Sequence, residues 1–188
     1  ELTIADNSFQ SKQVNNTSIS DNAISEFERL KETILKKDIS IHALDDDSEF
    51  DTPDAVFPNN WISFHKSHKA VLYPMYASNR RLERKSSTLE KLSNQGLNIE
   101  IIKDYSHFEN DNKFLEGTGS VVLDRKNKFA YSSMSSRSDN ELFKLFCSEM
   151  KVLGLHPRLV PRRGRGRYHN SNTVDLRHQD QGLPALIF

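Results

Sequence analysis

Residues 60–105, NWISFHKSHKAVLYPMYASNRRLERKSSTLEKLSNQGLNIEIIKDY, contain one complete unit of secondary structure. NWISFHK and AVLYPMY read as two strands because apolar and aromatic residues dominate them, and a short hairpin near Ser67–Lys69 joins them. The charged segment from Asn79 to about Asn94 carries three leucines on one side and predicts a helix, which Gly96 can cap. NIEIIKDY (98–105) predicts a third strand, so the order is strand, strand, helix, strand.

The same order extends outward on both sides of this unit. A helix from about 21 to 37 and a strand over 39–44 precede it, and residues 45–60 read as an acidic, proline-containing loop. SVVLDR and KFAYSSMS form a second hairpin, followed by a helix that Ser138 caps and that ends at Gly154. This repeat of ββαβ units, each of roughly 50–60 residues, predicts a propeller-like α/β arrangement in which every unit needs neighbours.

Composition excludes several classes of protein. The 188 residues suit one ordinary domain, and 26 Lys and Arg balance 26 Asp and Glu. A single cysteine excludes a disulfide framework, and the seven histidines have no metal-ligand spacing, so we expect neither a metal nor another cofactor. No stretch of about 18 apolar residues could span a membrane, and the first residues lack the features of a signal peptide. We therefore expect a reducing, cytoplasmic setting.

The C-terminal part differs from the rest of the chain in its charge and its hydrophobic pattern. Residues 158–188 hold six arginines against Asp175 and Asp180, with almost no hydrophobic period before the final apolar run LPALIF. We therefore divide the chain into a domain of residues 1–157 and a basic, irregular tail of residues 158–188. Two interpretations of the tail stay open: a disordered basic segment, or a frame-shifted end in place of the rest of the domain.

Two polar segments can bind a small ligand. Within DTPDAVFPNNW (51–61), a loop presents Asp54, Asn59 and Asn60 just before a strand, where carboxylate and amide groups can form hydrogen bonds. The alternative is ordinary turn chemistry, which favours the same residue types. In NRRLER (79–84), the forked guanidinium groups suit a carboxylate, although a solvated helix start with i,i+3 pairs also explains them.

Two further segments lie next to predicted strands. FLEGTGS (114–120) places a glutamate before small residues, which lets the backbone approach a ligand closely. Arg137, at the end of a strand, can capture an anion. Cys147 lies in the helical segment LFKLFCSEM without a histidine nearby in sequence, so we expect a buried structural cysteine rather than a nucleophile.

Taken together and in this order, DTPDAVFPNNW, LYPMYASNRRLER, FLEGTGSVVLDR and AYSSMSSR resemble the guanidino-group-modifying enzymes of the pentein fold. That superfamily includes arginine deiminases, dimethylarginine dimethylaminohydrolases and amidinotransferases. The citrulline-utilisation hydrolase, or amidinotransferase-like, branch is the most similar. The resemblance covers roughly residues 3–157 and implies a five-bladed α/β propeller of ββαβ units with the active site at its central axis. It also implies that this chain is an incomplete copy.

The resemblance implies a role for each motif. In the family a thiolate attacks the guanidinium or ureido carbon while a histidine shuttles protons. Glu116 corresponds to the carboxylate that orients this histidine, and Asp54 to a substrate-binding aspartate. Arg137, together with Arg80 or Arg81, corresponds to the arginines that hold the substrate carboxylate.

The substrate class follows from a pair of amides. Asn59 and Asn60 stand where the dimethylarginine-hydrolysing relatives carry Glu-Asp. A cationic guanidinium group favours carboxylates, whereas a neutral ureido group can be met by amides. The pair therefore favours a citrulline-like substrate over arginine.

Two catalytic groups depart from the family pattern. His169 lies at about the family's distance after Arg137 and follows a tyrosine, but the residues after it differ, so it is either the catalytic histidine or a coincidence. The family's nucleophilic cysteine has no counterpart in this chain, and Cys147 matches a helix cysteine seen in relatives.

These observations predict a hydrolase-family protein that cleaves C–N bonds of a ureido or guanidino amino acid by Cys/His covalent catalysis, with the nucleophile missing from this chain. The alternative is a non-catalytic, ligand-binding fragment or pseudoenzyme, and the choice between them stays open. We expect a small amino acid as the ligand, no membrane, and self-association through apolar edges where blades are missing. A nucleic-acid contact through the tail arginines has little support, because only Tyr168 interleaves them.

Overall fold

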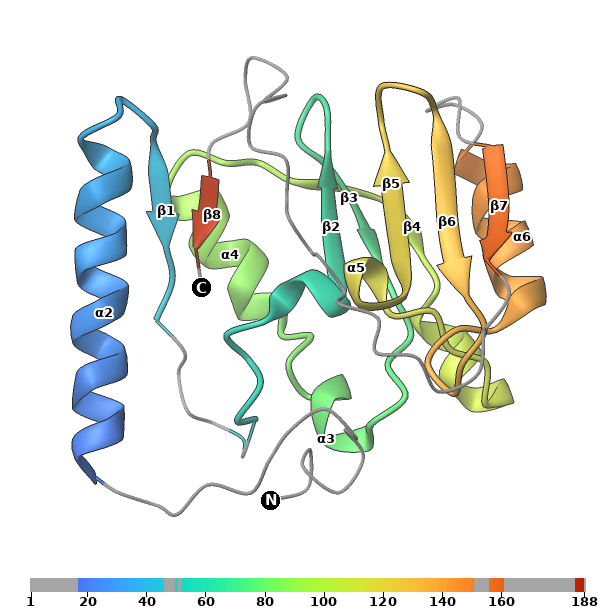
Figure 1. The fold of residues 1–188 in the computed structure, drawn as a ribbon, viewed down its shortest axis with the longest axis horizontal. Helices are drawn as coiled ribbons and strands as arrows, with labels where there is room; N and C mark the ends of the chain where they lie inside the picture. The colour runs from blue at the N-terminus through green and yellow to red at the C-terminus, as the bar shows by residue number, and fades with distance from the viewer. Residues whose placement is uncertain (1–16, 46–49, 51, 151–155, 161–184, 188) are drawn as a thin grey trace.

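The computed structural model describes residues 17–45, 50, 52–150, 156–160 and 185–187, which form a mixed α/β fold (Figure 1). These residues contain two three-stranded sheets and one two-stranded sheet. The helices are α2 (Thr17–Leu35), η1 (Pro58–Asn60), α3 (Ser78–Arg81), α4 (Ser86–Asn94), η2 (Ser106–Asp111), α5 (Gly117–Ser120) and α6 (Asn140–Glu149), where η denotes a 3₁₀ helix. The strands are β1 (Ile41–Ala43), β2 (Ile62–His65), β3 (Lys69–Leu72), β4 (Glu100–Asp104), β5 (Val121–Asp124), β6 (Phe129–Ser133), β7 (His156–Val160) and β8 (Ala185–Ile187).

The sheet formed by β2, β3 and β4 confirms the ββαβ order predicted for residues 60–105. β2 pairs antiparallel with β3, and β3 pairs parallel with β4. The prediction of one continuous helix before β4 is wrong, because the structure contains two helices, α3 and α4. Between them the Arg84 guanidinium donates a hydrogen bond to the Tyr73 carbonyl oxygen (3.1 Å). Lys85, the N-cap of α4, has an extended backbone conformation, so α4 begins as a separate helix.

The sheet formed by β5, β6 and β7 repeats the same topology. β5 pairs antiparallel with β6, β6 pairs parallel with β7, and α6 lies between these last two strands in the chain. Asp139, rather than Ser138, caps α6, because its carboxylate accepts the Leu142 N–H (2.8 Å). The buried hydroxyl of Ser138 is instead 2.5 Å from the hydroxyl oxygen of Ser132. The predicted repeat of ββαβ topology is therefore present twice.

The third sheet pairs β1, which follows α2, in parallel with β8 near the C-terminus. The helix α2 begins at Thr17, four residues before the predicted cap Asp21. The predicted boundary between domain and tail, after Pro157, falls inside β7, and the apolar run of the tail forms β8. Residues 161–184, which make up most of the predicted tail, lie outside the described residues.

The largest core cluster joins the two ββαβ units. It packs Val71 and Tyr73 from the first unit against Val121 and Ala130 from the second and against the buried face of α6. Cys147 belongs to this cluster and is buried, which confirms the predicted structural position of this residue. Burial also raises the pKa of its thiol to about 11. Each fully buried phenylalanine of such a core contributes about 1.5–3 kcal/mol.

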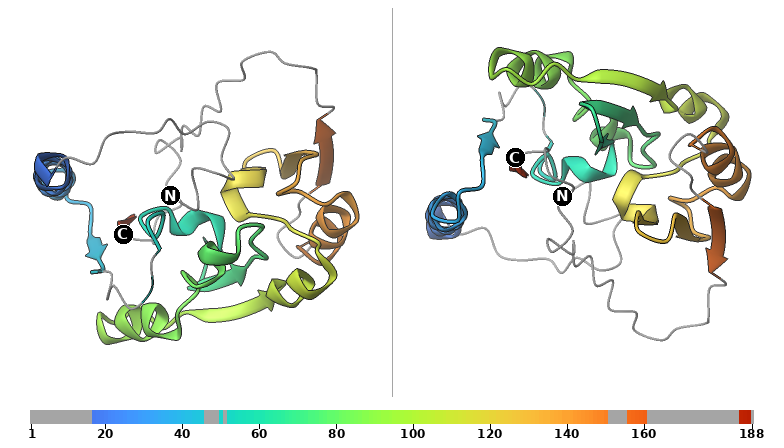
Figure 2. Two further views of the ribbon diagram at one scale, coloured as in Figure 1. Left: turned by 90° about the horizontal axis from the view of Figure 1, so that it is seen from below. Right: turned by 90° about the horizontal axis from the view of Figure 1, so that it is seen from above.

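The elements follow an open arc (Figure 2). Seen from below or above, the chain runs from α2 through α4 to α6 along the outside of the arc, whereas η1 (teal) and α5 (yellow) lie on its inner side. η1 and α5 contact each other, so short segments from both ββαβ units meet there. Within the described part of the chain, no helix has the length and apolar character needed to cross a bilayer.

A hydrogen-bond chain that runs from the core to the exposed Arg125 also links the two units. The His65 side chain is fully buried, with Nδ1 3.3 Å from the Arg125 guanidinium and Nε2 2.9 Å from the Ser63 hydroxyl. Because arginine can only donate, Nδ1 accepts and the ring proton resides on Nε2. The Ser63 oxygen also lies 2.8 Å from the Tyr73 hydroxyl. Burial, followed by the charge of Arg125, lowers the pKa of His65 from 6.5 to about 4.

This histidine makes stability depend on pH. The unfolded chain binds a proton at His65 near pH 6.5, whereas the folded chain resists that proton down to about pH 4. We therefore expect the folded state to lose roughly 3 kcal/mol through this group as the pH falls from 7 to 4. Urea unfolding of the wild type and of His65→Gln at a series of pH values measures the effect as a difference. Parallel pH profiles for the two proteins would contradict it.

Candidate active site

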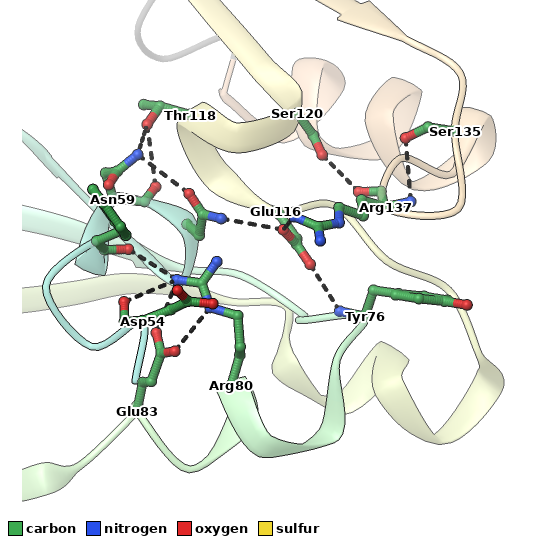
Figure 3. Close-up of polar contacts among 12 residues, drawn as sticks. Asp54, Asn59, Tyr76, Arg80, Glu83, Glu116, Thr118, Ser120, Ser135 and Arg137 are labelled. Carbon is green, nitrogen blue, oxygen red and sulfur yellow. Dashed lines mark hydrogen bonds and ion pairs between the residues drawn. The ribbon is translucent and has the colours of Figure 1, made fainter. Parts of the chain in front are cut away.

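Glu116 lies at the centre of a polar cluster on the inner side of the arc (Figure 3). Its side chain is fully buried, and both carboxylate oxygens accept hydrogen bonds from the protein. Oε1 accepts from the backbone N–H of Tyr76 (3.1 Å). Oε2 accepts from the side-chain amide of Asn60 (3.2 Å) and from Nη1 of Arg137 (3.5 Å). The donors come from three separate segments: η1, the residues after β3 and the residues after β6.

The backbone holds Glu116 and Arg137 next to each other. The Glu116 N–H donates to the Arg137 carbonyl oxygen (3.2 Å), and the Ser120 hydroxyl donates to that same oxygen (2.7 Å). The Ser135 hydroxyl accepts the Arg137 N–H (3.2 Å), which fixes the turn after β6. Arg137 therefore has a defined place beside the Glu116 carboxylate, and its capture of a ligand anion stays a prediction.

Burial dominates the electrostatics of Glu116. It raises the pKa of the carboxyl, and the charge of Arg137, the Tyr76 N–H, the charge of Arg80 and the Asn60 amide only partly oppose it. Its ionised form is therefore only partly stabilised by the donors around it, and a further donor that reached Glu116 would favour that form.

The predicted amide pair connects η1 to α5. The Asn59 side-chain amide donates to the Thr118 hydroxyl (2.6 Å) and to the Asn60 side-chain oxygen (3.2 Å). The helix α5 approaches so closely that a Cβ on Gly117 would lie 2.4 Å from the Asn59 carbonyl oxygen. Only glycine fits there, which explains the small residues after Glu116 in the sequence.

Arg80 and Glu83 form a buried pair below this cluster. Nε and Nη2 of Arg80 donate to the two carboxylate oxygens of Glu83 (2.8 and 3.0 Å), and the two side chains are only 5% and 1% exposed. Nη2 also donates to the carbonyl oxygens of Phe57 (3.1 Å) and Asp54 (3.4 Å). Arg80 thus ties α3 to the loop that carries the buried Asp54. The spacing is the i,i+3 pair expected for a solvated helix start, but the pair is buried.

Of the remaining predicted residues, Arg81 binds backbone carbonyl oxygens and His169 cannot be placed. Arg81 donates to the carbonyl oxygens of Met75 (2.9 Å) and Tyr76 (3.2 Å) and is 31% exposed. His169, the candidate catalytic histidine, lies outside the described residues. Among the described residues, no group of His, Cys, Asp and Glu side chains could hold a metal ion.

Sequence reasoning missed several groups that build the site. The donor from Tyr76 is a backbone N–H, which leaves no trace in the residue type. Thr118 and Glu83 were visible within recognised motifs, but only the folded arrangement shows which partners they meet. Glu109, whose carboxylate accepts the Met75 N–H next to Tyr76 (2.8 Å), lies in a segment that reads as an ordinary loop.

Comparison with known proteins found matches of two kinds. A family model described as N,N dimethylarginine dimethylhydrolase, eukaryotic, matches residues 1–172. The N-terminal domain of ArgZ, a cyanobacterial arginine dihydrolase of the ornithine–ammonia cycle, solved with bound substrate, is 20% identical. The match covers 75% of this chain and 46% of that one, with a TM-score of 0.54. No curated protein matches the chain.

A second solved structure gives the same picture. It is a dimethylarginine dimethylaminohydrolase mutant in adduct with S-methyl-L-thiocitrulline, 18% identical, with a TM-score of 0.53. The match covers 74% of this chain and 50% of that one. The present chain thus spans about half the length of these relatives, and the two similarities show a shared fold. The resemblance inferred from the four sequence motifs is confirmed.

The close approach of α5 to η1 leads to a first prediction for the site. We expect Gly117→Ala to lower the free energy of unfolding by about 1–3 kcal/mol, because the new methyl group meets a backbone carbonyl that cannot rotate away. Gly119→Ala is the comparison, because the atoms nearest to its methyl group belong to the Asn60 side chain, at 3.0 Å, and not to the backbone. Thermal and urea unfolding of both variants test this order. A variant Gly117→Ala as stable as Gly119→Ala contradicts the tight contact.

The buried ion pair leads to a second prediction. Arg80→Met should cost roughly 3–5 kcal/mol, because it leaves the Glu83 carboxylate buried without its partner. The double variant Arg80→Met/Glu83→Met should recover most of this loss, since it removes the orphaned charge as well. Lys144→Met breaks an exposed i,i+3 pair with Glu141 and serves as the control, with an expected cost below about 1 kcal/mol. Equal losses in the single and double variants would argue against the pair as the cause.

Proposed function

The chain belongs to the eukaryotic N,N dimethylarginine dimethylhydrolase family, and on this premise we propose that it acts in hydrolysis of a C–N bond of a ureido or guanidino amino acid. The buried Glu116 with its three donors is the observation that supports this proposal best. A carboxylate that is buried but incompletely compensated suits the task of orienting a catalytic imidazole.

We propose that the fold is part of a five-bladed α/β propeller. Two ββαβ units of identical topology lie along an arc, and the polar cluster lies on the inner side, where a propeller axis would run (Figure 2). The likeness to the solved relatives supports this arrangement. In this proposal the incomplete propeller domain, predicted over residues 1–157, extends to the end of β7 at Val160, because β7 pairs with β6, and the basic tail, predicted over residues 158–188, begins after it.

The proposed reaction has two chemical stages. A thiolate attacks the ureido or guanidino carbon, and the bond to the leaving amine breaks as a histidine donates a proton to that amine. Water then attacks the thio-linked intermediate while the histidine accepts its proton, and the thiolate is released. Glu116 holds the imidazole in place, and His169 is the candidate in this chain.

The proposed substrate contacts follow from exposure and charge. Arg137 is 23% exposed beside Glu116, so its guanidinium can reach a ligand carboxylate. Arg80 is turned toward Glu83 and two carbonyl oxygens, which makes it a less suitable partner than Arg137 or Arg81. We assign Asp54 to the ligand's polar groups, and Asn59 and Asn60 to a neutral ureido group, which favours citrulline over arginine.

A second candidate function rests on the cysteine. Cys147 is the single cysteine of the chain, and it lies in the core with a pKa raised to about 11, so it cannot supply a thiolate near neutral pH. Residues 1–188 on their own then fit a ligand-binding fragment or pseudoenzyme. Small amino acids are the expected ligands in both cases. A cytoplasmic setting, self-association and the weak case for nucleic acid stay predictions.

Calorimetry on the full chain tests the proposed ligand. We expect citrulline to bind more tightly than arginine, and Arg137→Met to weaken citrulline binding at least about tenfold, because a charge-assisted pair contributes about 1.5–3 kcal/mol. Arg29→Met, on the exposed surface of α2, should leave binding unchanged. Ammonia release from citrulline or arginine separates the hydrolase from the fragment. If neither citrulline nor arginine bound, both the hydrolase and the ligand-binding fragment would be refuted.

A further inference from the structure

Glu109 of η2 lies behind the segment that delivers the Tyr76 N–H to Glu116. Its Oε1 accepts the backbone N–H of Met75 (2.8 Å), the residue before Tyr76. Its Oε2 accepts from Nη2 of Arg84 (2.9 Å) and lies 3.8 Å from Nε of Arg81. The Glu109 side chain is 11% exposed, so these contacts form in a largely dry environment.

The two arginines bind the same segment through its carbonyl oxygens. Arg84 donates to the carbonyl of Tyr73 (3.1 Å), and Arg81 donates to the carbonyls of Met75 (2.9 Å) and Tyr76 (3.2 Å). We call Glu109, Arg81 and Arg84 the clamp. Since β3 ends at Leu72, the clamp adds hydrogen bonds to a segment whose backbone otherwise bonds only through the Tyr73 N–H, the Pro74 carbonyl and the Tyr76 N–H among the bonds described.

Aromatic contacts connect the clamp to the segment that carries Glu116. The Arg81 guanidinium carbon lies 5.5 Å from the centre of the Phe114 ring, and the Tyr76 ring meets Phe114 edge-on at 5.3 Å. Phe114 is two residues before Glu116, and the Leu115 N–H donates to the Pro74 carbonyl oxygen (3.3 Å). The two segments that bring Tyr76 and Glu116 together are therefore held on both sides.

We propose that Glu109 is a positioning residue, which fixes the Met75–Tyr76 backbone so that the Tyr76 N–H donates to Glu116. This inference rests on the role proposed for Glu116 in orienting a histidine. Without Glu109, the Met75 N–H and both guanidinium groups lose their shared acceptor, and the segment can move away from the carboxylate.

The direction in which the Glu116 pKa changes when Glu109 is replaced distinguishes a positioning role of Glu109 from a direct effect of its charge. The Tyr76 hydrogen bond lowers the pKa of Glu116, so loss of that bond raises it. Removal of the negative charge of Glu109 by itself lowers the pKa of a neighbouring carboxyl. The two explanations thus predict shifts in opposite directions.

The test is a ¹³C NMR titration of glutamate side chains in the full chain, with Glu116→Gln used to assign the Glu116 signal. We expect Glu109→Ala to raise the Glu116 pKa by about one unit, and the Tyr76 amide to exchange faster with solvent. Glu149→Gln is the control, because the partly exposed Glu149 bonds Tyr105 and Lys103 away from the site and should leave Glu116 unchanged.

A second variant tests the inference if Glu109→Ala does not fold. Glu109→Gln keeps the size of the side chain but loses the ion pairs with both arginines, so we expect a smaller rise in the same direction. An unchanged or lowered Glu116 pKa in folded Glu109→Ala or Glu109→Gln overturns the inference. The titration requires no substrate, so a chain that binds no amino acid would refute the proposed function without deciding the role of Glu109.

Discussion

The hydrogen bonding of one buried carboxylate constrains the arrangement of the molecule. An ionised Glu116 with no exposure to water is costly unless several donors reach it. The donors are Asn60, the Tyr76 N–H and Arg137, and they come from both ββαβ units. The units must therefore pack at one relative position, and α5 must approach η1 so closely that Gly117 has no room for a side chain.

The three arginines of NRRLER all bind backbone carbonyl oxygens. Arg80 binds those of Asp54 and Phe57, whereas Arg81 and Arg84 bind those of the segment that follows β3. A guanidinium group keeps its charge at every physiological pH and offers donors in a fixed fork, so it can hold irregular backbone in place of a sheet ladder. The segments around Glu116 thus gain rigidity where regular structure ends, and a site built in this way is preorganised.

The residues that stabilise the fold and the residues proposed to bind a ligand lie in different parts of the molecule. The core cluster under α6 and the hydrogen-bond chain from Tyr73 through Ser63 and His65 to Arg125 connect the two units behind the site. Cys147 belongs to that core, which explains a cysteine without reactivity. The polar residues assigned to ligand binding lie instead on short helices and turns around Glu116 (Figure 3).

The sequence by itself determined the ββαβ order, the mixed α/β class, the resemblance to the family and most residues of the polar cluster. Local periodicity and motif order carry that information, because both depend on neighbours along the chain. Only the tertiary structure decided that the i,i+3 pair of Arg80 and Glu83 is buried, that a backbone N–H donates to Glu116, and that Glu109 lies behind that N–H. These contacts join residues as far apart as Asn60 and Glu116, 56 positions in the chain, and depend on how the two units pack. The break between α3 and α4 has the same origin, since a contact with Tyr73 outweighs helical propensity at Arg84.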